Sequence, residues 1–145
     1  MIAEPRYPRR MNPSFADARA TWDARFDRVD YIFGTAPNVF LAGQAHRLKP
    51  GQRALCVADG KGRNSVWLAQ HGLTVSAFDI SVVGVRKAQA LAAGAGATVD
   101  FTVAGVDDFG WPTAAFDLVV AIFIQFATPS ERARLLARML DALVP

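Results

Sequence analysis

Internal disulfides, membrane spans and an export signal are all missing from this sequence. Cys56 is the only cysteine, so the chain can form no disulfide within itself. The longest apolar run, from Leu118 to Ile124, is far shorter than the roughly 20 residues of a membrane-spanning helix, and no apolar secretory segment stands near the N-terminus. We therefore expect no membrane partner and a cytoplasmic location, and we interpret residues 118–124 as a buried strand.

A concentrated positive charge is also missing. The formal net charge is +3, and residues 1–13 contribute two of these charges because Arg6, Arg9 and Arg10 outnumber Glu4. A nucleic-acid-binding protein gathers its positive charge on a folded face. We therefore predict no nucleic-acid partner, and we interpret residues 1–13 as a flexible basic leader.

The acidic residues do not have the spacing of metal ligands. Asp59, Asp79 and the adjacent pair Asp107 and Asp108 fall after or at the end of three different predicted strands, with no ligand spacing among them. The sequence therefore predicts no metal site.

What the sequence does have is a regular alternation of strand and helix patterns. The chain is 145 residues long and 52% hydrophobic, enough for one domain with a core. The predicted helices are 14–28, 38–48, 64–71, 81–93 and one that begins after Thr128; the predicted strands are 53–57, 73–79, 98–103 and 118–124. This alternation predicts an α/β fold with a Rossmann-like, mostly parallel sheet and helices on both faces.

A glycine-containing loop follows the first predicted strand. Gly60 and Gly62 let the backbone turn sharply and approach a ligand, and the N-terminus of the next helix offers unpaired N–H groups to an anion. Asp79 ends the second strand, where a carboxylate can accept hydrogen bonds from ribose hydroxyls. Each feature alone also has a structural explanation, as a turn or a helix cap. Together they predict a cofactor that contains a nucleoside.

The details of the loop favour S-adenosylmethionine over a dinucleotide. A dinucleotide loop has the form G-x-G-x-x-G, and Ser65 stands where its third glycine would be. Asp59 precedes the glycines and would repel a pyrophosphate, whereas a ligand carrying an amine and a sulfonium would tolerate it. A nicotinamide-dependent oxidoreductase therefore remains only as a disfavoured alternative.

The same residues carry a resemblance to a known family. Residues 55–64 (Leu-Cys-Val-Ala-Asp-Gly-Lys-Gly-Arg-Asn) resemble the cofactor motif of class I S-adenosylmethionine-dependent methyltransferases, in the small bacterial group related to tellurite-resistance and thiopurine methyltransferases. Further similar stretches are 22–26, 31–38, 78–81, 83–85, 87–88 and 116–123. The resemblance implies a methyltransferase domain over 14–145, divided into an N-terminal helical lid at 14–50 and a cofactor-binding sheet at 51–145.

The resemblance also implies roles for individual positions. Those that would hold the methionine part of the cofactor, or stand at the helix start beside it, are Asp59, Gly60, Gly62, Arg63 and Asn64. Those that would bind the ribose, the adenine or the region of the reactive methyl are Asp79, Ile80, Val106, Asp107 and Ile124. Those that would form the lid and the acceptor side are Tyr31, Phe33, Gly34, Asn38 and Gln125. We interpret Trp22, Phe26 and Tyr31 as core packing instead of a stacking platform.

Three positions depart from the family pattern. Gly105 stands where an Asp or Asn is common, Ala36 replaces a common Glu, and Gln125 replaces a common His. No strong general base is visible, which fits a small-molecule acceptor such as a thiol or another soft nucleophile and leaves the catalytic residue unknown. A catalytically impaired module that binds S-adenosylmethionine is the alternative.

The last residues leave the predicted sheet incomplete. Family members continue beyond Pro145 with a Gly-Gly turn and further strands, so strand 118–124 would have an exposed edge. We expect either that the chain is truncated or that a second copy covers this edge in a homo-oligomer.

Overall fold

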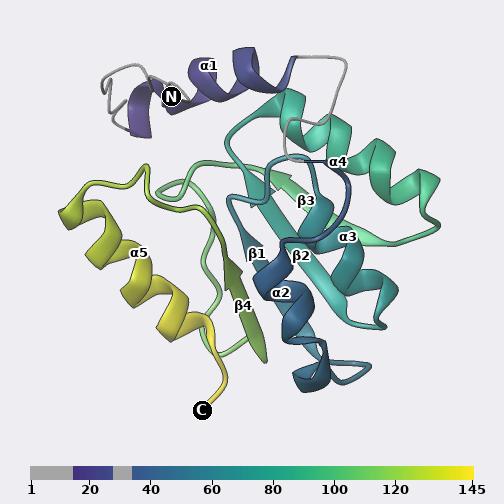
Figure 1. Ribbon diagram of the computed structural model, residues 1–145. Helices are drawn as coiled ribbons and strands as arrows, with labels where there is room; N and C mark the ends of the chain where they lie inside the picture. The colour runs from purple at the N-terminus through teal and green to yellow at the C-terminus, as the bar shows by residue number, and fades with distance from the viewer. Residues whose placement is uncertain (1–14, 28–33) are drawn as a thin grey trace, which may run out of the picture.

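Four parallel strands form the centre of the computed structural model, which describes residues 15–27 and 34–145 (Figure 1). The strands are β1 (Arg53–Val57), β2 (Thr74–Asp79), β3 (Val99–Val103) and β4 (Leu118–Ala121), in the order β3-β2-β1-β4. All three pairings are parallel. The expectations for the leader 1–13, for Tyr31 and for Phe33 lie outside the described residues.

Helices cover both faces of this sheet, as the alternation predicts. They are α1 (Phe15–Phe26), α2 (Val39–Gly43), α3 (Arg63–Gln70), α4 (Val82–Gly94) and α5 (Pro129–Ala142), with a short 3-10 helix at Ala45–Arg47. Alternate residues of β1 belong to two separate cores: Ala54 and Cys56 pack with Leu68 of α3, whereas Leu55 and Val57 pack with Leu135 of α5. The α/β class is confirmed. Among the described helices, none is long and apolar enough to cross a membrane.

The predicted helix starts are present with their hydrogen bonds. The Ser81 hydroxyl accepts from the N–H of Gly84 at the start of α4. At the start of α5, Thr128 and Glu131 form a capping box, in which each side chain accepts from the backbone N–H of the other residue. These caps satisfy N–H groups that the first turn of a helix would otherwise leave unpaired.

Two elements are shorter than predicted. The helix expected over 38–48 is α2 followed by the separate 3-10 turn, with Asn38 as the N-cap of α2. The strand expected over 118–124 ends at Ala121, whose partner Val57 is the last residue of β1. Beyond this pair, Ala58 turns away with a φ of 51°, so the chain after Ala121 has no strand to pair with.

Candidate cofactor site

A cavity lies at the carboxyl ends of β1 and β2, and residues of α1 form part of its wall. Eight of the candidate site residues line it: Gly34, Asp59, Gly60, Arg63, Asn64, Asp79, Ile80 and Val106. They come from the loops after β1, β2 and β3 and from the start of α3, which the parallel order brings to one edge of the sheet. Parallel α/β sheets commonly bind their ligands at this edge.

The loop after β1 follows a path that needs small residues. Ala58, Gly60 and Gly62 all have positive φ, at 51°, 62° and 86°. A Cβ on Gly62 would stand 2.8 Å from the Cβ of Ala88 in α4, so this glycine permits close packing of the loop against α4. Gly62 is not among the lining residues. Its role is therefore to shape the loop, while Gly60 borders the cavity.

Asp79 connects the end of β2 to this loop. One carboxylate oxygen accepts from the N–H of Gly60 at 2.9 Å, and the other accepts from the N–H of Ser81 at 2.9 Å. The side chain lies in the cavity wall, and burial raises its pKa, while these two backbone hydrogen bonds act in the opposite direction. The two bonds hold the carboxylate in one orientation beside the glycine loop.

Asp59 has one satisfied and one unsatisfied carboxylate oxygen. Ser65 donates its hydroxyl to Oδ2 at 2.5 Å, whereas Oδ1 is buried without a hydrogen-bond partner. Burial raises the pKa of Asp59 to about 7, the nearby Asp79 adds to the rise, and the Ser65 hydrogen bonds and Arg63 oppose it. Leaving a buried acceptor unpaired costs about 1–3 kcal/mol. The arrangement favours a ligand that brings a cationic N–H donor.

The start of α3 connects the cavity to the segment before α2. The Asn64 side-chain oxygen accepts from the N–H of Asn38 at 2.9 Å, and the Asn38 side chain in turn accepts from Phe40 and Leu41 at the start of α2. Asn38, predicted as a lid residue, thus contacts the lining residue Asn64 and does not itself line the cavity.

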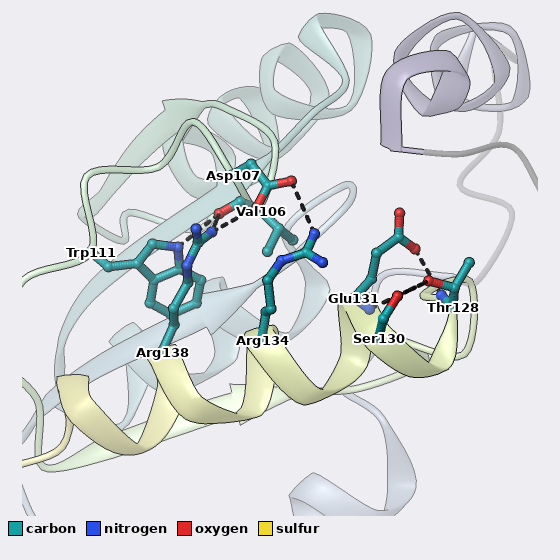
Figure 2. Close-up of polar contacts among 8 residues, drawn as sticks. All are labelled: Val106, Asp107, Trp111, Thr128, Ser130, Glu131, Arg134 and Arg138. Atoms are coloured by element: carbon teal, nitrogen blue, oxygen red, sulfur yellow. Dashed lines mark hydrogen bonds and ion pairs between the residues drawn. The ribbon is translucent and has the colours of Figure 1, made fainter.

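Asp107 does not line the cavity. Its carboxylate lies 2.9 Å from Nη1 of Arg138 and 3.6 Å from Nη2 of Arg134, both on α5 (Figure 2). The neighbouring Val106 carbonyl accepts from the same Arg138 at 2.7 Å and from the Trp111 indole N–H at 2.8 Å. Asp107 therefore fastens the loop after β3 to α5, and of this pair Val106 alone lines the cavity.

Ile124 and Gln125 also lie outside the lining. Ile124 packs against the core beside α5, and Gln125 is exposed. Ile122, Phe123 and Phe126, from the same segment of the chain, do line the cavity. The early end of β4 explains this shift, because the alternation of a strand no longer applies after Ala121.

Sequence reasoning did not assign the aromatic residues of α1 to the site. Trp22 and Phe26 line the cavity, although Phe26 is also only 3% exposed, as core packing requires. Their rings stack at 5.3 Å between centroids, and Trp22 meets Phe126 edge-on at 6.4 Å. The sequence shows the helical spacing of these aromatic residues, but it does not show that this face of the helix covers the cavity.

No metal cluster appears in the part of the chain that the structure describes: no three His, Cys, Asp or Glu side chains there are grouped to hold an ion.

A parallel sheet with a glycine loop after its first strand and a buried carboxylate at the end of its second is the arrangement typical of nucleoside-binding α/β domains. The family model described as "Methyltransferase domain" matches residues 54–145, more than half of the chain. The chain therefore belongs to this family of methyltransferase domains. No curated protein matches it.

Solved structures share the fold. The PH0226 protein from Pyrococcus horikoshii is 27% identical, with a TM-score of 0.66 over 72% of this chain and 50% of its own. The [4+2]-cyclase SpnF is 27% identical, with a TM-score of 0.65 over 73% of this chain and 41% of its own. The magnesium protoporphyrin IX methyltransferase of Synechocystis, solved with bound S-adenosylhomocysteine, is 18% identical, with a TM-score of 0.72 over 89% of this chain and 68% of its own. This chain thus spans about half the length of the first two proteins.

Proposed function

We propose that this chain is the cofactor-binding part of an S-adenosylmethionine-dependent methyltransferase that acts on a small molecule. The observation that carries the proposal is the junction of Asp79 and Gly60, which sets a buried carboxylate beside a bare glycine turn. In this arrangement one ligand can bring its sugar to Asp79 and its amino-acid tail to the loop at the same time.

Each part of the cavity suits one part of this cofactor. Each oxygen of Asp79 has a lone pair beyond the one used by the backbone, so the carboxylate can still accept from ribose hydroxyls. Ile80 and Val106 offer apolar surface for the adenine. The unpaired oxygen of Asp59 suits the ammonium of the methionine part, and the positive end of the dipole of α3, which Gly62 caps without a side-chain hydrogen bond, suits its carboxylate.

The bound cofactor would supply a methyl group on a positively charged sulfur. The chain would contribute mainly by positioning the acceptor and excluding water. Among the described lining residues there is no histidine, and Trp22, Phe123 and Phe126 give the cavity wall aromatic surface that would face the acceptor. This composition supports an acceptor that needs no strong base, such as a thiol or another soft nucleophile.

Binding of the cofactor without methyl transfer is the second candidate. Gly105 provides no side chain toward the adenine, and a similar structure carries the description of a [4+2]-cyclase instead of a methyltransferase. A fold of this kind therefore does not by itself imply methyl transfer.

Two measurements separate these functions. Calorimetric titration with S-adenosylmethionine, S-adenosylhomocysteine and NAD is expected to show binding of the first two compounds alone. Release of S-adenosylhomocysteine is then measured with a panel of thiol acceptors. Binding without release favours the second candidate, and binding of NAD alone contradicts both.

A further inference from the structure

One carboxylate holds α1 against the rest of the domain, and it has no role in the site described so far. Oδ1 of Asp23, in the last turns of α1, accepts from the hydroxyl of Ser81 at 2.5 Å and from the N–H of Val83 at 3.3 Å. We infer that Asp23 is a positioning residue, which docks α1 on the first turn of α4 and thereby places Trp22 and Phe26 over the cofactor. The inference rests on the proposed function.

Ser81 connects Asp23 to the carboxylate proposed to bind the ribose. Ser81 is fully buried, and its oxygen already accepts from the N–H of Gly84. Its single hydroxyl proton therefore goes to Asp23, while its backbone N–H goes to Asp79. A continuous set of hydrogen bonds thus runs from α1 through Ser81 and Asp79 to the loop at Gly60.

The apolar contacts of α1 need a partner that fixes its position. A Cβ on Gly84 would stand 2.8 Å from Cδ2 of Phe26, and a Cβ on Gly60 would stand 3.2 Å from Cζ of the same ring. The ring of Phe26 therefore fills a notch between two glycines. Apolar packing is not directional, whereas the Asp23 hydrogen bonds are. Asp23 and Phe26 lie three residues apart on one side of the helix. Together they fix where α1 lies on the domain and how it is rotated about its own axis.

Charge makes this docking specific. Val83 lies in the first turn of α4, where the helix dipole and unpaired N–H groups stabilise a carboxylate. The charge of Asp23 also contributes to the raised pKa of Asp79, after burial as the main cause. Replacing the charged carboxylate of Asp23 by a neutral side chain that keeps the acceptor oxygen is therefore expected to lower the pKa of Asp79. A loss of packing alone would not lower this pKa.

The test compares Asp23→Ala and Asp23→Asn with the control Asp27→Ala. Asp27 is an exposed acidic residue one position past α1, whose side chain has no hydrogen bond or ion pair among the described residues. Amide hydrogen exchange of residues 18–26 is measured by mass spectrometry without ligand, and S-adenosylhomocysteine affinity is measured by calorimetry from pH 5 to 8.

Asp23→Ala is expected to increase exchange in 18–26 and to weaken S-adenosylhomocysteine binding, each by about ten-fold, as loss of a hydrogen bond to a charged group predicts. Asp23→Asn keeps an acceptor oxygen and is expected to stay within about three-fold of the unmutated chain, with the part of its pH profile due to Asp79 moved to lower pH. Asp27→Ala is expected to change neither quantity.

Unchanged exchange in Asp23→Ala overturns the inference, and so does faster exchange with unchanged affinity, because α1 would then be docked without positioning anything. If Asp23→Ala does not fold, Ser81→Ala, which removes the hydroxyl that donates to Asp23, is measured in the same way, and unchanged exchange of residues 18–26 in this variant overturns the inference. Failure of the unmutated chain to bind S-adenosylhomocysteine contradicts the proposed function instead, and the ligand-free exchange of α1 still tests the docking.

Discussion

Asp79 and Gly60, the last residue of β2 and the centre of the loop after β1, share a hydrogen bond of 2.9 Å from the glycine N–H to the carboxylate. The bond joins the two segments that would hold opposite ends of one ligand. Because Asp79 is 6% exposed, the bond is shielded from water and contributes more than an exposed one would. The geometry of the proposed cofactor site therefore depends on this contact.

Replacing Asp79 tests this directly. Asp79→Ala removes the ribose acceptor and the support of the loop, so S-adenosylhomocysteine binding is expected to weaken by about 1.5–3 kcal/mol, the range for a hydrogen bond to a charged group. Isothermal calorimetry measures the change. Asp100→Ala, which removes an exposed carboxylate from β3, is the matched control and is expected to have no effect. Equal affinities in the two variants would rule out the assigned ribose site.

The raised pKa of Asp59 predicts how stability depends on pH. The pKa is 3.8 for an ordinary aspartate and about 7 in the folded chain, so between these values the folded state holds a proton that the unfolded state has released. The free energy of unfolding of the ligand-free chain is therefore expected to fall as the pH rises from about 4 to about 7. Urea denaturation at pH 5, 6, 7 and 8 measures the slope.

Asp59→Asn separates this effect from other titrations. The variant is expected to lose most of the slope and to be more stable than the unmutated chain at pH 8, because no charge is then buried. Its affinity for S-adenosylhomocysteine is expected to fall, since the ammonium loses its counter-charge. A variant with the original slope would show that another group, such as Asp79, causes it.

Gly62 is expected to tolerate no side chain. In Gly62→Ala the new Cβ would stand 2.8 Å from Ala88, and the residue would keep a φ of 86°, so we expect destabilisation of about 1–3 kcal/mol from overpacking and backbone strain. Gly94→Ala is the control: it lies at the end of α4 with nothing within 4 Å of an added Cβ, and is expected to be neutral or slightly stabilising. Thermal unfolding of both variants decides.

Asp107 is expected to matter little for the cofactor. Asp107→Ala breaks its ion pairs with Arg134 and Arg138, which are partly exposed, so stability should fall by less than about 1 kcal/mol and S-adenosylhomocysteine affinity should stay within about two-fold. Calorimetry and thermal unfolding give the two values. A ten-fold loss of affinity would instead support the role at the adenine edge that the resemblance implies.

The parts of the site that sequence predicted well are those that depend on neighbours in the chain. Ser81 and Thr128 cap the helices expected of them, because a cap needs only the residues that follow it. Gly60 and Asp79 meet at one edge because consecutive parallel strands bring their carboxyl ends together. The ion pairs of Asp107, by contrast, could not be predicted, since nothing near it in the chain reveals the two arginines of α5.

By itself the sequence determined the α/β class, the glycine turn and the position of the buried carboxylate, since periodicity, glycine freedom and helix caps are local properties. Only the tertiary structure decided which side chains face the cavity. β4 ends at Ala121 because its partner ends at Val57, and this contact across the sheet brings Phe123 and Phe126 to the wall in place of Ile124. Likewise Phe26 lies over Gly60 because α1 docks on α4, far along the chain, and packing between distant segments leaves no mark in a local pattern.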